Sequence, residues 1–326
     1  MIRWSLEEIH LPKAPGDFYA WPPKNFRVYV DDSTDTVHVQ AEFATNMTSL
    51  EVQREFQEFL AAEHDDNSLE GFVATLDQLA LSPEMRAGLE MGFVHFWAYL
   101  FMMQVPEILN IPGKSIAPTS YPLPLINPNL VGDYIREHDL TRFGALTLHL
   151  HPQISAVAYV QAVQTAYPHQ IYIHAHQHWE DARDVQAFLG QIDLSRVAFI
   201  AQPLAAHNFA QMQKLLTDEK VAWFGEECLG QQDIGPGTAA IYQGVCLSLT
   251  RSGGYFPILR QIKSAQQLNL KIALDSGIST SLLAASAMHL ANEVDFREYG
   301  GFLWPHEEKE GCLSEDHGQV FFSYLQ

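Results

Sequence analysis

The sequence contains few cysteines, few positive charges and no long apolar segment, and each of these shortages excludes a class of protein. Only three cysteines occur in 326 residues, Cys228, Cys246 and Cys312, and their spacing fits neither a disulfide framework nor a zinc ribbon. Lysine and arginine together number 19 against 39 aspartates and glutamates, which gives a formal net charge of −20. A chain this acidic lacks the basic face that nucleic acids and anionic membranes require, so we expect neither as a partner.

No segment is apolar enough to suggest a membrane span. The longest mostly apolar stretch, from Met91 to Val105, includes His95 and Gln104 and is too short to cross a bilayer. The first eight residues lack the apolar core of a signal peptide. With 47% hydrophobic and 18% charged residues, the composition is that of a protein with a large buried core. We therefore expect a cytoplasmic protein.

Residues 1–111 are predicted to form an α+β unit. Residues 26–30 and 36–41 alternate between apolar and polar side chains, and the acidic and hydroxyl residues between them are typical of a turn. From Thr48 the apolar residues recur at helical spacing, and Ser82 followed by Pro83 is a favourable helix start. The unit is predicted to end near the Ile-Pro-Gly-Lys segment that begins at residue 111.

Residues 112–305 carry a regular repeat of strand-like and helix-like segments. The strand-like segments end near positions 149, 174, 201, 226, 248 and 275, at intervals of 25, 27, 25, 22 and 27 residues. A strand, a helix and two short loops fill about that length, so the repeat predicts a parallel (β/α) barrel of the TIM type. A doubly wound open sheet is the alternative, but no glycine-rich phosphate-binding segment follows the first strand. Because barrel active sites lie at the C-terminal strand ends, the residues at these positions are expected to surround one pocket.

Four histidines stand at the ends of two of these predicted strands. One strand reads Ile-Tyr-Ile-His-Ala-His from residue 171, and side-chain alternation places His174 and His176 on the same face. The preceding strand reads Leu-Thr-Leu-His-Leu-His from residue 146, which adds His149 and His151. The sequence therefore predicts that the four imidazoles converge on one point of the barrel mouth.

Four segments of this second unit together resemble the enolase superfamily, of the mandelate racemase and muconate-lactonising enzyme type. They read RVAFIAQP, FGEECL, LSLTRSGG and LNLKIALDSGISTSL, from residues 196, 224, 247 and 268. Their order and spacing most closely resemble o-succinylbenzoate synthases and dipeptide epimerases, over roughly residues 115–305. The resemblance implies an enolase-type barrel over residues 112–305, with residues 1–111 as its capping domain and residues 306–326 returning towards the cap.

The resemblance also implies a reaction, which is abstraction of a proton α to a carboxylate by a lyase or by a racemase or epimerase. In that family three acidic residues at strand ends hold a Mg²⁺ ion that stabilises the enolate, and lysines on two opposite strands act as base and as acid or cation. A small-molecule carboxylate is then the expected ligand. For an o-succinylbenzoate synthase the implied pathway is menaquinone biosynthesis.

Most of the metal-binding positions of the family carry other residues in this sequence. The Asp-x-Asn of the third strand reads His174-Ala-His176, and the fourth-strand glutamate is Ala201. The fifth strand keeps a carboxylate, Glu226, which is followed by Glu227. Mg²⁺ prefers oxygen ligands in octahedral geometry, so the Mg²⁺ site that the resemblance implies is expected to be lost.

The lysine positions of the family are replaced as well. The Lys-x-Lys of the second strand reads His149-Leu-His151, the sixth-strand lysine is Ser248, and the glutamate expected near the seventh strand is Ser279. None of the eight lysines of the chain falls at a predicted strand end. Without a stabilised enolate an α-proton cannot be removed at neutral pH. We therefore expect the protein to be a degenerate member that has lost the family's reaction. The catalytic position equivalents are His149, His151, Glu226 and Ser248.

Three hypotheses for the histidines remain open. In the first, they line a retired active site that binds a small molecule or a partner protein. In the second, the two His-x-His pairs, with His174 and His176 as the main ligands, bind Zn²⁺ or another late divalent metal together with Glu226 and Asp275. The protein is then a hydrolase with Glu226 or Glu227 as base. In the third, His151 acts as an acid/base group that Glu226 positions. The remaining predicted pocket residues are Ala201, Asp275, Ser276, Ser279, Thr119 and Ser120.

Overall fold

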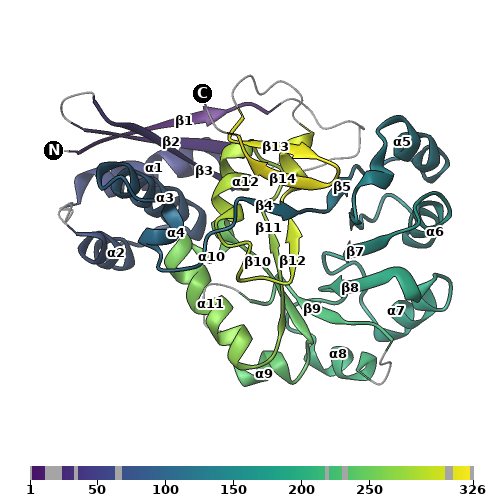
Figure 1. Cartoon of the computed structure of the whole chain (residues 1–326). Helices are drawn as coiled ribbons and strands as arrows, with labels where there is room; N and C mark the ends of the chain where they lie inside the picture. Colours follow the sequence, from purple (N-terminus) through teal and green to yellow (C-terminus); the bar gives the residue numbers. More distant parts are fainter. Residues whose placement is uncertain are drawn as a thin grey trace.

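The computed structural model describes residues 2–11, 24–32, 36–62, 68–216, 220–229, 234–304 and 311–323. A capping region formed by the N-terminal elements lies beside a barrel formed by the later ones (Figure 1). Within these residues no helix has the length and the apolar character needed to cross a membrane. The three cysteines are free thiols.

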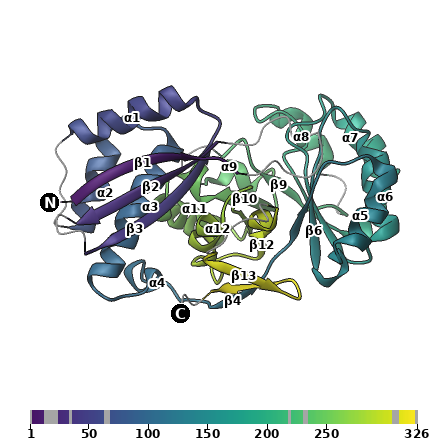
Figure 2. The same ribbon diagram turned by 90° about the horizontal axis from the view of Figure 1, so that it is seen from above.

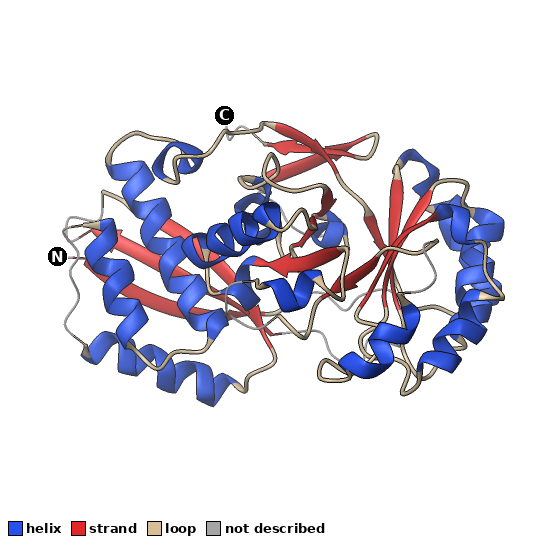
Figure 3. Ribbon diagram, turned by 90° about the horizontal axis from the view of Figure 1, so that it is seen from below, coloured by secondary structure: helices blue, strands red, loops and turns tan. Residues whose placement is uncertain are grey.

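The capping region is one antiparallel sheet with helices on one of its faces. The sheet has the order β1-β2-β3 and is formed by Ile2–Ile9, Lys24–Asp32 and His38–Thr45. The helices are α1 (Ser49–Ala61), α2 (Leu69–Gln78), α3 (Pro83–Leu100) and the short α4 (Val105–Ile108). Figure 3 shows these helices covering one face of the sheet. The predicted strands and helices of this region are confirmed. Of the predicted turn at residues 31–35, Asp31 and Asp32 belong to β2, and residues 33–35 lie outside the described residues.

Both predicted helix starts are formed by side-chain caps. The hydroxyl of Thr48 accepts a hydrogen bond from the backbone N–H of Glu51, whose carboxylate in turn accepts from the backbone N–H of Thr48 at 2.8 Å. The hydroxyl of Ser82 caps α3 by accepting from the backbone N–H of Met85, with Pro83 at the first helical position, where no backbone donor is needed. These caps fix where α1 and α3 begin, and the apolar faces of the two helices pack on the sheet.

The barrel is a sheet of eight parallel strands whose spatial order follows the sequence. This confirms the predicted (β/α) barrel and excludes the doubly wound alternative. The backbone N–H of Ser120 donates to the carbonyl of Arg297 at 3.0 Å, which joins the first strand to the last. The strands are β5 (Tyr121–Leu123), β6 (Ala145–His149), β7 (Gln170–His174), β8 (Val197–Ala201), β9 (Trp223–Gly225), β10 (Gly244–Ser248), β11 (Lys271–Asp275) and β12 (Phe296–Glu298).

The six predicted strand ends agree with these bounds, since five are the last residue of a strand and Glu226 follows β9 directly. Helices cover the outside of the sheet (Figure 2). They are α5 (Val131–Glu137), α6 (Ala156–Ala166), α7 (Ala182–Leu189), α8 (Phe209–Leu215), α9 (Pro236–Ala239), α10 (Leu249–Ser252), α11 (Tyr255–Gln267) and α12 (Ser281–Met288). Short 3-10 turns lie at Pro128–Leu130, Leu140–Arg142, Leu194–Arg196 and Gly300–Leu303.

On the family resemblance, residues 115–121 stand where the first barrel strand is expected, and this placement is wrong. The strand β4 (Ile116–Pro118) pairs instead with the C-terminal hairpin of β13 (Leu313–Asp316) and β14 (Gln319–Phe322), and the barrel begins at β5. The two strands are separated by only two residues, Thr119 and Ser120. Local strand propensity cannot tell these sheets apart, because the pairing partner lies about 200 residues away in the sequence.

Aromatic side chains fill the inside of the barrel below its mouth. The ring of Phe199 stacks on Tyr172 and Phe224, at centroid distances of 4.9 and 4.3 Å, and meets Phe296 edge-on at 5.2 Å. Small buried residues, Ala201 among them, complete this cluster. The barrel is therefore a packed core rather than a pore, and chemistry is confined to its C-terminal mouth.

The cap is attached to the barrel through buried polar contacts. The carboxylate of Glu42 in β3 accepts hydrogen bonds from the backbone N–H of Thr280, at 3.1 Å, and from its hydroxyl. On α3, Glu90 accepts from the backbone N–H of Phe256 at 2.9 Å. Gly254 has a φ of 113°, and a Cβ there would lie 2.4 Å from the Glu90 carboxylate. These contacts hold the cap beside the loops that follow the sixth and seventh barrel strands.

Candidate functional site

The parallel pairing of the strands brings their last residues to one level. His149 of β6 is paired with His174 of β7, which is paired with Ala201 of β8. The same level continues on the other side of the barrel with Ser248, Asp275 and Glu298. The strand ends predicted from the sequence therefore do meet at one mouth.

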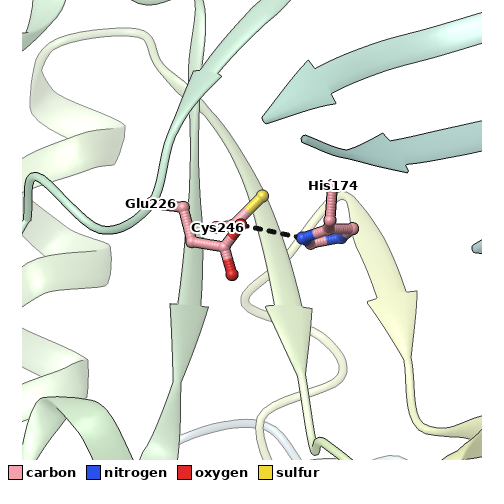
Figure 4. A group of neighbouring side chains, drawn as sticks. All are labelled: His174, Glu226 and Cys246. Carbon is pink, nitrogen blue, oxygen red and sulfur yellow. Dashed lines mark hydrogen bonds and ion pairs between the residues drawn. The ribbon is translucent and has the colours of Figure 1, made fainter. Parts of the chain in front are cut away.

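His174 lies between two buried carboxylates. Its Nδ1 is 2.8 Å from a carboxylate oxygen of Glu226, and its Nε2 is 3.0 Å from one of Glu298 (Figure 4 shows the contact with Glu226). The exposed fraction is 1% for His174, 5% for Glu226 and 4% for Glu298. Because both ring nitrogens face acceptors, both must carry a proton. Burial lowers the pKa of His174, but the charges of Glu298 and Glu226 and their hydrogen bonds outweigh it and hold this pKa well above its usual value.

Glu226 has a second positive neighbour. Its other carboxylate oxygen accepts a hydrogen bond from the guanidinium of Arg251 at 2.8 Å. Burial raises the pKa of Glu226, but the charges of His174 and Arg251 hold it well below its usual range. Both oxygens of this carboxylate are thus occupied by cationic donors of the protein itself.

Glu298 accepts a hydrogen bond from a hydroxyl group on β6. The Thr147 hydroxyl donates to Glu298 at 2.7 Å and lies 2.7 Å from the hydroxyl of Ser120. Thr147 is two residues before His149 on β6, so both side chains point into the mouth. A continuous hydrogen-bonded network therefore runs from the first strand of the barrel to the sixth, with the imidazolium of His174 at its centre.

A second histidine group lies nearer the surface. Nδ1 of His149 is 2.9 Å from Nε2 of His176, and Nδ1 of His176 is 2.9 Å from a carboxylate oxygen of Glu227. Burial, followed by the charges of His174 and His176, lowers the pKa of His149 well below its usual value, so this ring is neutral at neutral pH. His176 was expected to lie on the strand, which is wrong. β7 ends at His174, and His176 reaches the group through a left-handed backbone with a φ of 49°.

A cavity of about 710 Å³ opens above these groups. Asn46 from the cap forms part of its wall, and Pro122, Leu125, Leu150 and Ile278 give it an apolar side. Its polar lining includes His149, His151, His176, His178, Glu227, Arg251, Asp275 and Glu298. The cavity is therefore amphipathic and large enough for a small organic molecule.

Asp275, the last residue of β11, faces this cavity from the side opposite the histidine strands. Its carboxylate accepts a hydrogen bond from the backbone N–H of Gly277 at 2.7 Å. Burial, and then the charge of Glu298, raises the pKa of Asp275 to about 6. At neutral pH the carboxylate is mainly ionised and adds negative charge to the mouth.

Not all of the four predicted histidines meet. His149, His174 and His176 form one cluster, with ring centroids 5.0 to 5.9 Å apart. His151 lines the same cavity, and its Nδ1 accepts a hydrogen bond from the backbone N–H of Gln153. The expectation of one point shared by all four is therefore only partly met, because β6 ends before His151 and the chain turns away.

The remaining predicted pocket residues divide into lining and supporting groups. Ser120 lines the cavity, whereas the hydroxyl of Thr119 accepts from the backbone N–H of Tyr299. Ala201 is fully buried in the barrel core, and Ser248 lines a separate cavity of about 240 Å³ beside Glu226.

Two predicted serines follow the seventh strand. The hydroxyl of Ser276 is 3.4 Å from the carbonyl of Glu298, and Ser279 is buried with no hydrogen-bond partner for its hydroxyl among the described residues. Neither appears in the lining of the main cavity. Both therefore support the mouth rather than face a ligand in it.

The residues at this mouth do not fit a magnesium ion. Both nitrogens of His174 and both oxygens of Glu226 are already engaged within the protein, and Ala201 offers no donor atom. Mg²⁺ requires several oxygen ligands in near-ideal octahedral geometry. No lysine is among the described residues that line the cavity.

Three residues of the network were not predicted. Glu298 ends β12, 23 residues after Asp275, an interval that falls within the repeat of 22 to 27 residues used to find the other strand ends. Thr147 lies two residues before His149, and alternation alone places it on the same face. Arg251 follows β10 by three residues, and no sequence signal indicates that its side chain returns to Glu226.

The geometry agrees with what comparisons with known proteins found. The sequence model of one family, described as enolase C-terminal domain-like, matches residues 133–320. One curated relative, an L-Ala-D/L-amino acid epimerase of a Maribacter species (strain HTCC2170), is 27% identical over 131 residues. That match spans 40% of this chain and 39% of the epimerase, so the chain is matched to less than half the length of that relative.

Solved structures match nearly the whole chain. A mandelate racemase/muconate lactonizing enzyme from a Roseiflexus species has a TM-score of 0.83 at 13% identity, covering 98% of this chain and 94% of its own. The L-Ala-D/L-Glu epimerase of Bacillus subtilis also has a TM-score of 0.83 at 13% identity, and the match covers 99% of this chain and 96% of the epimerase. A dipeptide epimerase of Methylococcus capsulatus, complexed with Mg and L-Arg-D-Lys, has a TM-score of 0.80 at 17% identity, and the match covers 99% of this chain and 96% of that epimerase. At these identities the likeness establishes the fold alone.

Proposed function

Because the chain belongs to the enolase C-terminal domain-like family, we propose that it keeps that family's barrel mouth as a binding pocket and has lost metal-assisted proton abstraction. The ligand we propose is a small zwitterion of the dipeptide class. One observation carries the proposal, which is the placement of His174 between the carboxylates of Glu226 and Glu298.

The loss of proton abstraction follows from that placement. Of the three positions that hold the metal ion in the family, the sequence resemblance finds a carboxylate at one, Glu226. The ring of His174 lies directly against this carboxylate. A ring that donates to two carboxylates supplies the positive charge they need and repels a metal ion from the same place. Stabilisation of the developing enolate is usually the largest catalytic term, and this mouth has neither the oxygen ligands for a Mg²⁺ ion nor a lysine to provide it.

The charge pattern of the cavity supports a zwitterionic ligand. The side chain of Arg251 is 41% exposed and uses one of its amino groups for Glu226, so further N–H donors are open to a ligand carboxylate. Asp275 and Glu227 line the same cavity and offer acceptors to an ammonium group. The apolar wall at Leu125 and Ile278 accommodates a side chain. A dipeptide combines these three features, and the similar epimerases named above act on that class.

An o-succinylbenzoate synthase-like lyase is less well supported. Its reaction needs the same metal ion and the same lysines, and the cavity offers neither. An aromatic dicarboxylate would also place a second negative group among Asp275, Glu227 and Glu298 with only Arg251 to receive it. The menaquinone pathway is therefore no part of our proposal.

The test is to measure binding and proton exchange separately. Full-length protein purified without a histidine tag and treated with EDTA is titrated by calorimetry with a panel of dipeptides that includes L-Ala-L-Leu and L-Ala-L-Glu, and we expect the neutral L-Ala-L-Leu to bind without Mg²⁺. In a second measurement the same dipeptides are incubated in D₂O with Mg²⁺, and α-deuteration is followed by NMR. We expect no exchange above the protein-free rate, with the Bacillus subtilis epimerase as the positive control.

A pair of arginine variants separates the pocket from general charge effects. Arg251→Gln should weaken dipeptide binding at least tenfold. Arg136→Gln, which removes an arginine that is 75% exposed and pairs with Asp133 on α5, should leave binding unchanged. Mg²⁺-dependent α-deuteration would overturn the loss of the reaction, and the absence of binding by any dipeptide of the panel would overturn the ligand class.

A further inference from the structure

We propose that His149 and His176 form a binding site for a late first-row divalent metal ion, with Zn²⁺ as the best-suited ion, at the open side of the cavity. This site is distinct from the lost magnesium position, because it uses two imidazoles on the rim rather than the buried carboxylates below. It also goes beyond the proposed dipeptide binding and does not depend on it, since the metal alone is the ligand tested.

The two imidazoles already have the separation of a chelating pair. Nδ1 of His149 and Nε2 of His176 lie 2.9 Å apart, and the ring planes differ by only 10°. Ligand nitrogens bound at 2.0–2.1 Å to tetrahedral zinc are roughly 3.3 Å apart. A shift of a few tenths of an ångström therefore replaces the proton between the rings with a metal ion. Both residues line the cavity of about 710 Å³, which leaves room for water or a ligand to complete the coordination.

Glu227 supports the site from behind. One of its carboxylate oxygens is 2.9 Å from Nδ1 of His176, the ring nitrogen that faces away from His149. Metal-binding histidines commonly donate their second N–H to a carboxylate in this way, which fixes the tautomer and makes the ring a better ligand. The other oxygen of Glu227 is buried and has no hydrogen-bond partner among the described residues. A buried, unpaired carboxylate oxygen is costly, and a divalent charge on His176 reduces that cost.

The surroundings also favour a cation. A carboxylate oxygen of Glu226 comes within 4.8 Å of ligand atoms of His176 and Glu227. Around the cavity the carboxylates are Glu226, Glu227, Asp275 and Glu298, and they outnumber the cations even when His174 is counted as positive together with Arg251. Imidazole nitrogen selects Zn²⁺ and its late first-row neighbours over Mg²⁺. The site is therefore expected to discriminate strongly against magnesium.

The experiment uses tag-free, EDTA-treated full-length protein and metal ions without any dipeptide. Co²⁺ is titrated as a spectroscopic probe, with visible absorption bands reporting nitrogen coordination, and Zn²⁺ is then used to displace it. We expect one ion per chain, and no displacement by millimolar Mg²⁺. His149→Ala and His176→Ala should each weaken binding at least tenfold, and Glu227→Gln should weaken it by about tenfold or more, as for other residues that orient a ligand.

His151→Ala and His178→Ala are the matched controls, because both histidines line the same cavity and neither belongs to the pair. We expect their affinities to stay within about twofold of the wild type. Circular dichroism spectra of all variants establish that they fold. The proposal is overturned if folded wild-type protein gives no cobalt bands, or if the two control variants lose as much affinity as His149→Ala and His176→Ala. Neither result bears on calorimetric dipeptide binding in EDTA, so the two proposals can fail separately.

Discussion

Nδ1 of His174 lies 2.8 Å from a carboxylate oxygen of Glu226, and both side chains are almost completely buried. The same ring meets Glu298 with its other nitrogen, and Arg251 meets the other oxygen of Glu226. The barrel mouth thus contains a buried, internally neutralised network. Removing one member of such a network costs more than the network contributes as a whole, because its partners remain buried and unpaired.

Replacing His174 should therefore destabilise the protein strongly. His174→Leu leaves Glu226 and Glu298 buried without the ring between them, and we expect a loss of about 3–5 kcal/mol in the free energy of unfolding. Urea denaturation measures this loss. His151→Leu, which changes a half-buried histidine that lines the same cavity, serves as the control and should cost less. A loss below about 1 kcal/mol for His174→Leu would show that the ring is not the cation of this network.

Magnesium should have no effect on thermal stability. A ligand that binds the folded state at one hundred times its dissociation constant stabilises it by about 2.7 kcal/mol, so even moderate binding shifts the melting temperature. Calorimetric melting in EDTA and then in millimolar MgCl₂ should give the same temperature, since the ligands for the ion are absent. The Methylococcus capsulatus epimerase, whose structure contains Mg, is the control in which a shift is expected. An equal shift in both proteins would contradict our interpretation of the mouth.

Two glycines offer a matched test of how the mouth is packed. A Cβ on Gly301 would lie 1.7 Å from the backbone carbonyl of Gly277, whereas a Cβ on Gly144 would have no heavy atom within 4 Å. We expect Gly301→Ala to reduce the free energy of unfolding by about 1–3 kcal/mol, because backbone must move to admit the methyl group. Gly144→Ala should change it by no more than about 1 kcal/mol. Urea denaturation of both variants is the measurement, and equal effects would mean that the loops at the mouth adapt freely.

Stability should fall as the pH falls, in part because of His289. Burial, and then the nearby His95, lowers the pKa of His289 to about 3. The unfolded chain takes up this proton near pH 6.5, whereas the folded chain resists it until about pH 3, so stability is lost as the pH decreases between these values. Over the interval from pH 6.5 to 5 the loss from this group is about 2 kcal/mol.

The variant His289→Gln should abolish that part of the pH dependence. Urea denaturation at pH 7 and pH 5 compares it with the wild type, and the difference in unfolding free energy between the two pH values should shrink by about 2 kcal/mol. His207→Gln changes an exposed histidine and should leave the wild-type difference intact. Identical pH dependence in His289→Gln and the wild type would mean that His289 accepts its proton in the folded state.

The repeat of strand ends could be predicted from the sequence because each parallel unit is local. A strand, a loop and a helix occupy a nearly constant length, so positions such as 149, 174 and 275 follow from counting apolar segments. The pairing of β4 was not predictable in this way. Its partner β14 lies at the other end of the chain, and three residues of strand-like sequence do not specify which sheet edge they join.

The candidate site was predictable in position but not in its connections. His149, His174 and Glu226 were all expected at the mouth, and they are found there. That His174 would meet Glu298, and that Arg251 would return to Glu226, depended on the closure of the barrel and on a side chain that crosses between strands. His176 reached its partner through a left-handed turn, a conformation that strand alternation does not anticipate.

By itself, the sequence determined the family, the barrel and the loss of the lysines and acidic ligands that the family's reaction uses, since these are properties of residue identity and spacing. Only the tertiary structure decided which charges neutralise each other, because that depends on distances of about 3 Å between side chains more than 50 residues apart, such as His174 and Glu226. The same structure placed two of the four histidines side by side on the rim and left His174 committed to the buried carboxylates below.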